Sequence, residues 1–516
     1  MKLINSEKLS RKYNVMKTLF PCGLKCSLHL HPADNVALAL QPLLPGMEVE
    51  VSGKNVKTRD FVPYGHKFAI ETIPLGAWVI KYGQPIGQAI RLIEPGYHVH
   101  VHNLASARNL RNLVEIGAQM HSLGVPKILL NKVEFRGFQR KDGRIGVRNH
   151  VLVLATVHCA NGVVEQIGKK TGAVAIPHIY GCSQLGEDLV QTRRILEGYA
   201  SHPNVGAVLL VGLGCETMPT VEIADELRRQ GINTQCILIQ EEGGSRNAVN
   251  RGVKIVRRLL REVSKVHREP VPVSELIVGV ECGGSDAWSG ITANPAVGLV
   301  ADLLVSLGGT VILSEVTEFI GAEHLLAARA VSPTVAQRIL EAVARREAAA
   351  KEMGIDLQGA QPSPGNMAGG LTTLEEKSLG AITKGGSTLI QEFVGYGERP
   401  TARGLVVMDT AGNDPESVTA MVAGGAQIVL FTTGRGTPVG NPIAPVIKIA
   451  SNTPVYKKLA DDMDLNAGTV LEGKTLLEVG RRIFEFLCKV AGGASTAAER
   501  WGYRELFAIE PLGPRV

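Results

Sequence analysis

Acidic side chains and one cysteine follow two short apolar segments near the middle of the chain. The run at 276–280 (LIVGV) leads directly into ECGGSD, and the run at 310–313 (TVIL) leads into SEVTE. Carboxylates bind hard divalent metals and act as general bases, and a thiolate favours iron over magnesium. The pattern therefore predicts a site for chemistry at these two turns. If a metal takes part, its candidate ligands are Glu281, Cys282, Asp286, Glu318 and Glu323, and Glu315 is a candidate catalytic residue.

Both segments are expected at one edge of a parallel sheet. The apolar runs are short and rich in β-branched residues, as buried strands are, and Pro295–Leu307 between them has apolar residues at roughly helical spacing. Strand, polar turn, helix and strand form a βαβ unit, in which ligands bind at the carboxyl ends of the strands. A second explanation stays open: the Gly-Gly-Ser-Asp turn only caps the next helix, because caps use the same residue types.

Other strand ends carry candidates for handling a substrate. The strand-like run QIVLFTT ends in a Gly-Arg-Gly turn, which presents backbone N–H groups beside a guanidinium and suits a carboxylate or phosphate. Arg435 is therefore the candidate clamp for an acidic substrate. His178 stands next to the turn at Cys182 and is the candidate proton carrier, because imidazole titrates near neutral pH. Neither a GxGxxG nor a P-loop sequence occurs in a suitable context, so a nucleotide is not expected.

The composition describes an ordinary globular protein of several domains. The 516 residues exceed what one core accommodates, and 58 glycines, clustered behind apolar runs, suit an α/β protein with many strand-to-helix turns. The net charge is +6, but no run of like charges occurs, which argues against nucleic acid. No segment approaches a membrane span, no secretory signal is recognised, and the eight cysteines are expected as thiols. A cytoplasmic location is predicted.

The N-terminal part of the chain carries a series of histidines. Short alternating segments broken by Pro and Gly, from about residue 28 to 103, predict a small all-β module. Alternate residues on a strand share one face, so histidines two residues apart indicate a metal or anion site. The alternative is a polar stripe that faces solvent. The histidines are His29, His31, His98, His100 and His102, and His66 is predicted to join them if the module folds back on itself.

Longer phrases of the sequence resemble one known family. They include HPADNVALAL, GHKFAI, HVHVHN, GRIGVRN, HIYGCSQLGED, ECGGSDAWSGITANP, SPGNMAGGLTTLEEKSLG and LFTTGRGTP, and they run in order from about His31 to Leu506. Together they resemble the altronate/galactarate dehydratase family of sugar-acid hydro-lyases. HIYGCSQLGED and HVHVHN resemble its altronate branch more than its galactarate branch. Leu189 stands where the altronate enzymes tend to have histidine, so that position is not counted as functional.

The resemblance implies an α/β multidomain fold. It implies a β-clip (SAF) domain over 26–104, an α/β middle domain over 133–270 that mediates dimerisation, and a Rossmann-like parallel-sheet domain with a metal site over 271–516. A linker at 105–132 and an extension at 1–25 complete the predicted organisation. The resemblance further implies iron(II) or manganese as the cofactor, sensitivity to oxidation, and a homodimer.

The implied reaction is the dehydration of a small sugar acid, most simply of D-altronate to 2-keto-3-deoxy-D-gluconate. It requires a base for the proton beside the carboxylate, a Lewis acid for the carboxylate and enolate, and an acid for the departing hydroxyl. Galactarate or another aldaric acid is the alternative substrate, and a non-enzymatic sensor of sugar acids is the alternative function. The remaining candidates are Lys377 for catalysis and Ser285, Asn366, His31 and His66 for substrate binding.

Four strand-end cysteines raise a different chemistry. Some dehydratases use an iron–sulfur cluster as the Lewis acid, and three thiolates can hold one while an iron stays open. No tight CxxC pair supports a cluster here, and cysteines also serve as small buried hydrophobes. A mononuclear metal is therefore predicted, and a cluster is not expected. The four residues are Cys159, Cys182, Cys215 and Cys282.

Overall fold

The computed structural model describes residues 26–108, 133–355, 357 and 361–512. These residues divide into two compact units. The first unit holds the described residues up to Ala107 together with Gly370–Thr373, and the second holds Arg108–Gly369 and the described residues from Leu374 onward. The predicted extension at 1–25 and most of the predicted linker lie outside the described residues. Among those described, no helix has the length and apolar character needed to cross a membrane.

The first unit is an all-β module, as the sequence predicts. Its strands are β1 (Ser27–Leu28), β2 (Val36–Ala39), β3 (Glu48–Val51), β4 (Lys54–Lys57), β5 (Lys67–Ala69), β6 (Trp78–Lys81), β7 (Gln84–Ala89), β8 (His98–Val99) and β9 (Leu104–Ala105). They pair antiparallel in the orders β1-β2-β5-β8 and β6-β7-β9 and in the hairpin β3-β4. The hairpin turns at Ser52–Gly53, where both residues have positive φ, the conformation that matches the twist of paired strands.

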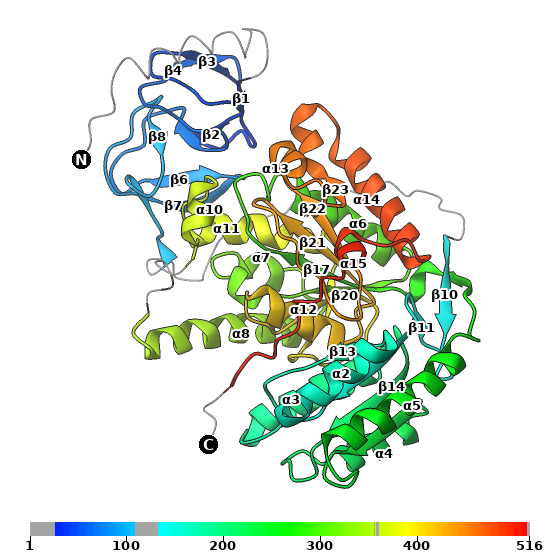
Figure 1. Cartoon of the computed structure of the whole chain (residues 1–516). Helices are drawn as coiled ribbons and strands as arrows, with labels where there is room; N and C mark the ends of the chain where they lie inside the picture. The colour runs from blue at the N-terminus through cyan, green and yellow to red at the C-terminus, as the bar shows by residue number, and fades with distance from the viewer. Residues whose placement is uncertain (1–25, 109–132, 356, 358–360, 513–516) are drawn as a thin grey trace, which may run out of the picture. The chain divides into compact units, whose positions relative to one another are not determined.

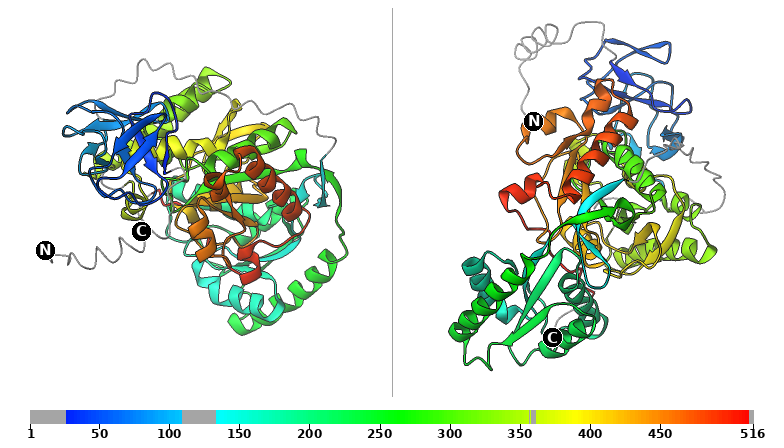
Figure 2. Two further views of the ribbon diagram at one scale, coloured as in Figure 1. Left: turned by 90° about the horizontal axis from the view of Figure 1, so that it is seen from above. Right: turned by 90° about the vertical axis from the view of Figure 1, so that its right-hand side faces the viewer.

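The second unit begins with a small parallel sheet in the order β13-β12-β14-β15. Helices α2 to α5 flank this sheet (Figure 2), and a separate antiparallel sheet, β11-β10-β16, adjoins it in the sequence. The elements are β10 (Glu134–Gln139), β11 (Ile145–Gly146), β12 (His150–Ala155), η2 (His158–Ala160), α2 (Asn161–Thr171), β13 (Val174–Ile176), α3 (Gly186–Ala200), β14 (Val205–Gly212), α4 (Thr220–Arg229), β15 (Thr234–Leu238), α5 (Ser245–Val263) and β16 (Glu269–Pro272).

A seven-stranded parallel sheet, in the order β19-β20-β18-β17-β21-β22-β23, forms the rest of the second unit (Figure 1). Its strands are β17 (Ile277–Cys282), β18 (Thr310–Leu313), β19 (Ile390–Val394), β20 (Gly404–Met408), β21 (Ile428–Thr433), β22 (Val446–Ala450) and β23 (Leu465–Asn466). Strands β18, β20, β21 and β22 are buried along their whole length, which explains their continuous apolar sequence.

Helices and short 3-10 turns connect the strands of this sheet. The predicted helix after the first acidic segment is observed as α6 (Ala293–Ser306). The others are η3 (Val273–Glu275), η4 (Val316–Glu318), α7 (Glu323–Ala327), α8 (Pro333–Glu352), α10 (Pro364–Ala368), α11 (Leu374–Ala381), η5 (Ile382–Gly385), α12 (Asp414–Ala423), α13 (Thr453–Lys458), η6 (Ala467–Glu472), α14 (Leu476–Ala491) and α15 (Ala497–Trp501).

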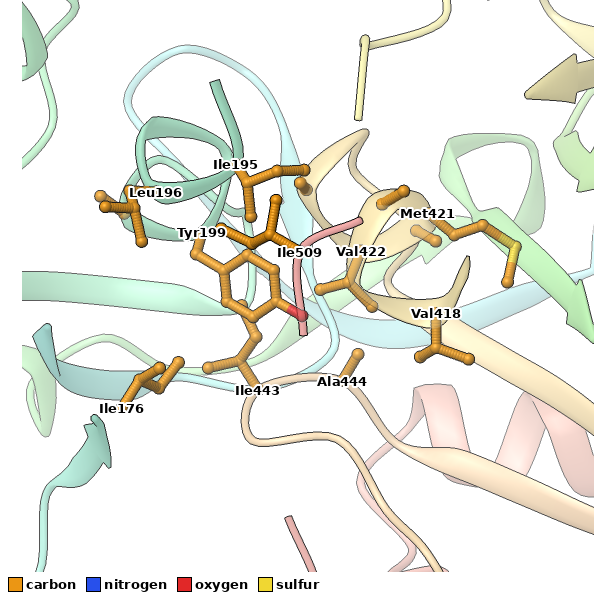
Figure 3. Close-up of a cluster of buried hydrophobic side chains, with 14 of the residues drawn as sticks. Ile176, Ile195, Leu196, Tyr199, Val418, Met421, Val422, Ile443, Ala444 and Ile509 are labelled. Carbon is orange, nitrogen blue, oxygen red and sulfur yellow. The ribbon is translucent and has the colours of Figure 1, made fainter. Parts of the chain in front are cut away.

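One hydrophobic core joins the two parallel sheets of the second unit. Figure 3 shows Ile195 and Tyr199 of α3 pointing toward Val422 of α12, and all three side chains are buried. The two helices approach closely at Gly198, where a Cβ atom would lie 2.6 Å from the carbonyl oxygen of Ala423. The smaller sheet and the larger sheet are therefore expected to unfold together, since neither buries this surface without the other.

Truncation of Ile195 tests this shared core. Ile195→Ala removes buried methyl groups between α3 and α12 and is expected to lower the free energy of unfolding by about 2–5 kcal/mol. Val190→Ala, at a half-exposed position of the same helix, is the control and should change stability by no more than about 0.5 kcal/mol. Equilibrium denaturation of the full chain measures both. A separate early transition for the smaller sheet in the Ile195→Ala variant would contradict a shared core.

Candidate active site

The two acidic segments meet at one edge of the seven-stranded sheet, as predicted. Strands β17 and β18 are parallel neighbours with Val280 opposite Leu313, so the residues that follow them emerge side by side. Glu281 is fully buried near the end of β17, and Glu315 is fully buried directly after β18. Glu315 adopts a left-handed conformation (φ 69°), and its backbone N–H donates to the Thr410 hydroxyl, which follows β20. Three neighbouring strand ends thus position this region.

Two lysines and three acidic groups interlock in the inner part of the site. The Lys384 ammonium lies 2.7 Å from Glu315 Oε2, 3.1 Å from Cys282 Sγ and 3.7 Å from Glu318 Oε2. The Cys282 thiol donates to Glu318 Oε2 at 2.9 Å. Lys377 from α11 pairs with the other oxygen of Glu318 at 2.8 Å. Every member of this group is buried.

A second acidic group extends from Glu281. Its Oε2 atom accepts from the Ser417 hydroxyl at 2.7 Å. Ligand atoms of Glu281, Glu315 and Asp414 lie within 4.8 Å of one another, and those of Cys282, Glu315 and Glu318 do so too. Among the residues that the structure describes, no donor reaches the buried Oε1 atoms of Glu281 and Glu315. Buried carboxylate oxygens without donors are expected where a cation or a shared proton binds.

Burial and crowding set the proton affinities of this centre. Burial, together with the charge of Glu315, raises the pKa of Glu281 far above its usual range. Burial and Glu318 raise the pKa of Glu315 to about 7. The same two causes raise the pKa of Asp414 to about 6. Burial opposes the charge of Glu318 as well, but Lys377 and Lys384 outweigh it and lower its pKa.

The acidic groups outnumber the cations that face them. Four carboxylates, from Glu281, Glu315, Glu318 and Asp414, surround the ammonium groups of Lys377 and Lys384. Two carboxylate charges therefore require a proton or an added cation. Carboxylate oxygens with one thiol form a donor set that suits iron(II) or manganese. The residues present fit the metal that the sequence predicts.

Asp286, a predicted ligand, lies in a different environment. Its carboxylate accepts hydrogen bonds from the Ser289 backbone at 2.9 Å, the Ser451 hydroxyl at 2.8 Å and the Asn452 amide at 2.9 Å. These neutral donors use the lone pairs that a metal would need. Asp286 thus joins its own turn to the end of β22. Helix α6 begins only at Ala293, with Thr292 at its N-cap and no side-chain cap bond, so the Gly-Gly-Ser-Asp turn does not cap that helix.

Three further predicted residues organise the surrounding loops. Glu323 pairs with Arg108 at 2.5 Å and accepts from the Gly321 backbone at 2.6 Å. Asn366 forms a capping box with Ser363 at the start of α10. Its amide also donates to the Ser285 carbonyl at 2.8 Å, so these two predicted substrate contacts bind each other.

Arg435 lies on the outer side of the turn that follows Cys282. Its backbone N–H donates to the Gly284 carbonyl at 2.9 Å, and its side chain is exposed. The same turn passes so close to Asp414 that a Cβ atom on Gly283 would lie 2.3 Å from the carboxylate. The same Cβ atom would lie 2.6 Å from the Phe431 ring, so glycine suits the position between Asp414 and Phe431.

His178 lies in the smaller sheet and contacts none of the acidic groups described above. Its Nε2–H donates to the Ala155 carbonyl at 2.6 Å, and its Nδ1 accepts from the Tyr180 backbone at 3.1 Å. Burial, despite the bond to Ala155, lowers the pKa of His178 to about 4. A neutral ring with both nitrogens bound to the backbone is suited to holding the β13–α3 loop.

The four strand-end cysteines separate into two places. Cys159, Cys182 and Cys215 follow β12, β13 and β14 and are exposed, whereas Cys282 is buried at the end of β17 in the other sheet. The role of a small buried hydrophobe therefore fits none of the four, since Cys282 is buried but bonds to Glu318 and Lys384. His31 and His66, predicted to bind substrate, belong to the first unit, where the backbone N–H of Ala33 donates to Nδ1 of His31 at 3.1 Å.

Lys384 and Asp414 are the site residues that the sequence-based candidate set lacks. Asp414 follows a predicted strand and could have been found by the same rule that gave Glu315. Lys384 stands in η5 after a helix, 102 residues beyond Cys282. No spacing or motif around Lys384 signals its position.

Exchange of His178 separates a structural role from proton transfer. The unfolded chain protonates this histidine near pH 6.5, whereas the folded chain does so only near pH 4. The unfolded state thus binds more protons in this interval, and stability falls as pH decreases through it, by at most about 1.4 kcal/mol per pH unit. His178→Gln should reduce that slope, measured by urea denaturation from pH 7 to 4.5, with His267→Gln on the surface as control. A hundredfold loss of turnover with unchanged stability would instead identify a proton carrier.

Comparisons with protein families and with known proteins agree with this architecture. The D-galactarate/altronate dehydratase C-terminal family matches residues 273–512, the second-domain family matches 137–264, and the altronate/galactarate dehydratase SAF domain matches 25–107. The chain is 37% identical to an altronate dehydratase of Escherichia coli over 93% of its length and 98% of the relative. It is 36% identical to an altronate dehydratase of Bacillus subtilis (94% and 98% covered) and 36% identical to a galactarate dehydratase of Escherichia coli (93% and 96% covered). The resemblance seen in the sequence is confirmed, and the chain, an α/β protein with an N-terminal SAF domain, belongs to the altronate/galactarate dehydratase family of hydro-lyases.

Proposed function

We propose that the protein dehydrates D-altronate to 2-keto-3-deoxy-D-gluconate with the aid of iron(II) or manganese. The observation that carries this proposal is the buried acidic centre, in which two carboxylate oxygens have no donor and four carboxylates face two ammonium groups. Relatives named altronate dehydratase support the substrate. Galactarate is the second candidate, because a galactarate dehydratase is also similar over nearly the whole chain.

The proposed metal would be held by Cys282 and Glu318 or by Glu281 and Asp414, in each case beside Glu315. Glu315 belongs to both groups of convergent ligand atoms, so it lies beside the ion in either arrangement. When bound, the ion would act as a Lewis acid for the substrate carboxylate and the enolate that forms from it. Asp286 and Glu323 are not assigned to the metal, because neither belongs to a group of convergent ligand atoms among the described residues.

Glu315 is the proposed base. Its pKa of about 7 leaves it able to accept a proton near neutral pH, and Lys384 at 2.7 Å holds its carboxylate in place. The carbon–hydrogen bond beside the substrate carboxylate breaks, its proton passes to Glu315, and its electron pair forms a carbon–carbon double bond. That bond expels the neighbouring hydroxyl as water. The enol product then rearranges to the 2-keto acid.

Lys377 is the proposed acid for the departing hydroxyl. Burial disfavours its charge, but Glu318 at 2.8 Å raises its pKa, so it carries a proton to give. Arg435, exposed at the outer side of the turn, is proposed to bind the substrate carboxylate through its planar fork of N–H groups. Asn366 and Ser285 are proposed to shape the adjoining loop, and a role for His31 in substrate binding stays a prediction. A homodimer is also proposed, to be tested by sedimentation.

Removal of the metal tests the chemistry and the substrate together. Protein treated with a chelator is expected to lose more than nine-tenths of its activity and to recover it with iron(II) or manganese under anaerobic, reducing conditions. Release of 2-keto acid from altronate and from galactarate is followed in parallel. Full activity in protein shown to be metal-free would contradict metal dependence. Turnover of galactarate alone would leave the chemistry intact and change the substrate.

Removal of the proposed base tests the mechanism. Glu315→Gln keeps the size of the side chain and should lower kcat about 10²–10⁴-fold, because an amide cannot accept the proton. Glu323→Gln is the comparison, since this buried acid is paired with Arg108, and it should retain its iron(II) content. Metal content and kcat are measured for both variants. Activity within threefold of the parent in Glu315→Gln, or loss of metal in Glu323→Gln, would require a new assignment of these two residues.

A further inference from the structure

The histidines of the first unit gather in one place. The ring centres of His66 and His98 lie 5.1 Å apart, those of His66 and His100 5.0 Å, and those of His98 and His100 5.3 Å. The ring of His102 lies 5.4 Å from that of His98. His66 is buried, His98 and His100 are half-buried, and His102 reaches the surface. The predicted folding-back that brings His66 to the HVHVH sequence is therefore observed.

We propose that this cluster of His66, His98, His100 and His102 binds a divalent first-row transition metal such as zinc or iron(II). Imidazole nitrogen is the preferred donor of these ions, whereas magnesium and calcium prefer oxygen. The proposed site uses ligands of the first unit alone and is independent of the function proposed for the acidic centre. It adds a second metal to the protein, bound by softer donors.

The distance between two ring nitrogens supports this site. Nδ1 of His66 and Nε2 of His98 lie 3.0 Å apart. Two nitrogens that each lie 2.0–2.1 Å from one ion are separated by roughly 3.0 Å at a right angle and about 3.4 Å at a tetrahedral angle. The observed pair thus already has the spacing of two ligands to one ion. A side-chain rotation of His100 or His102 would supply the third.

The surroundings favour the neutral, metal-binding form of imidazole. Burial, together with the neighbouring His66, His100 and His102 and the nearby Lys67, lowers the pKa of His98 to about 3. Burial and the charge of Arg91 lower the pKa of His102, although the carboxylate of Asp60 opposes them. A neutral imidazole binds a metal without first releasing a proton.

The backbone holds the ligands in place. His98 lies on β8 opposite Phe68 of β5, two residues beyond His66. The Asn103 amide donates to the His98 carbonyl at 2.9 Å, and its oxygen accepts from the His100 backbone at 2.9 Å. Asp60 accepts from the His98 backbone at 3.3 Å and places a carboxylate beside the cluster. Outer groups of this kind orient the ligands of metal sites.

Cobalt(II) provides a test because its visible absorption reports its ligands. The full-length Glu281→Gln/Glu318→Gln double variant, which removes one proposed ligand from each group of the acidic centre, is freed of metal and titrated with cobalt(II). We expect it to bind one equivalent with visible ligand-field bands. Adding His98→Gln or His66→Gln should weaken that binding at least tenfold and remove the bands. His29→Gln, a histidine of the same module that bonds to Ser52 and the Asp34 carbonyl, is the matched control and should bind as before.

A second measurement needs no histidine variant, so it still tests the proposal if those variants fail to fold. X-ray absorption of the zinc-loaded Glu281→Gln/Glu318→Gln double variant should show a shell of imidazole nitrogens at about 2.0–2.1 Å. A shell of oxygen or sulfur alone would overturn the proposal. Unchanged cobalt(II) binding in both folded histidine variants would overturn it as well, and would leave His66 and His98 as a hydrogen-bonded pair.

Discussion

The Lys384 ammonium group is fully buried between the carboxylate of Glu315, at 2.7 Å, and the thiol of Cys282, at 3.1 Å. Burial alone would drive off its proton, but Cys282, Glu315 and Glu318 reverse that effect and raise its pKa. Removing one partner from such a buried pair costs about 3–5 kcal/mol, because the other charge is left without compensation. The carboxyl edge of the larger sheet therefore depends on this lysine: without it, the buried carboxylates of Glu315 and Glu318 would repel each other.

The fold stabilises these buried charges by fixing the backbone around them from several sides. Parallel pairing of β17 with β18 and β21 sets where Glu281 and Cys282 emerge, and Thr410 after β20 holds the strained backbone of Glu315. Gly283 lets the following turn pass against Asp414, a position that any side chain would fill. The smaller sheet shares its core with the larger one through α3 and α12, so it stiffens the same body. A preorganised set of charges acts on a reacting group without reorganising first, which is the main source of electrostatic catalysis.

The protein has two clusters of titratable side chains, one acidic and one made of histidines. At the acidic centre, burial and like charges raise the pKa values of Glu281, Glu315 and Asp414, and an added cation would relieve the excess negative charge. At the histidine cluster, burial and the neighbouring histidines lower the pKa of His98 and favour its neutral form. Hard oxygen donors and softer imidazole donors select among metals differently. The two sets of ligands would thus allow one chain to hold two ions without competition for the same site.

The sequence alone determined the backbone framework and the type of chemistry. Short apolar runs that end in ECGGSD and SEVTE sufficed to predict parallel strands with Glu281 and Glu315 at a common edge, because the carboxyl ends of neighbouring parallel strands must coincide. Short segments of alternating polar and apolar residues sufficed to predict that the first unit is all-β. Longer sequence motifs sufficed to recognise the family, and the comparisons confirm it.

Only the tertiary structure decided which polar side chains share a site. Asp286 and Glu281 stand five residues apart, yet one meets neutral donors from the end of β22 and the other meets Glu315. His178 has the right chemistry for proton transfer, but its position in the smaller sheet gives both nitrogens backbone partners. Lys384 arrives from far along the chain, in a turn without any motif. A strand end fixes where a side chain starts, whereas its partners come from loops distant in sequence, and those partners set its charge and its role.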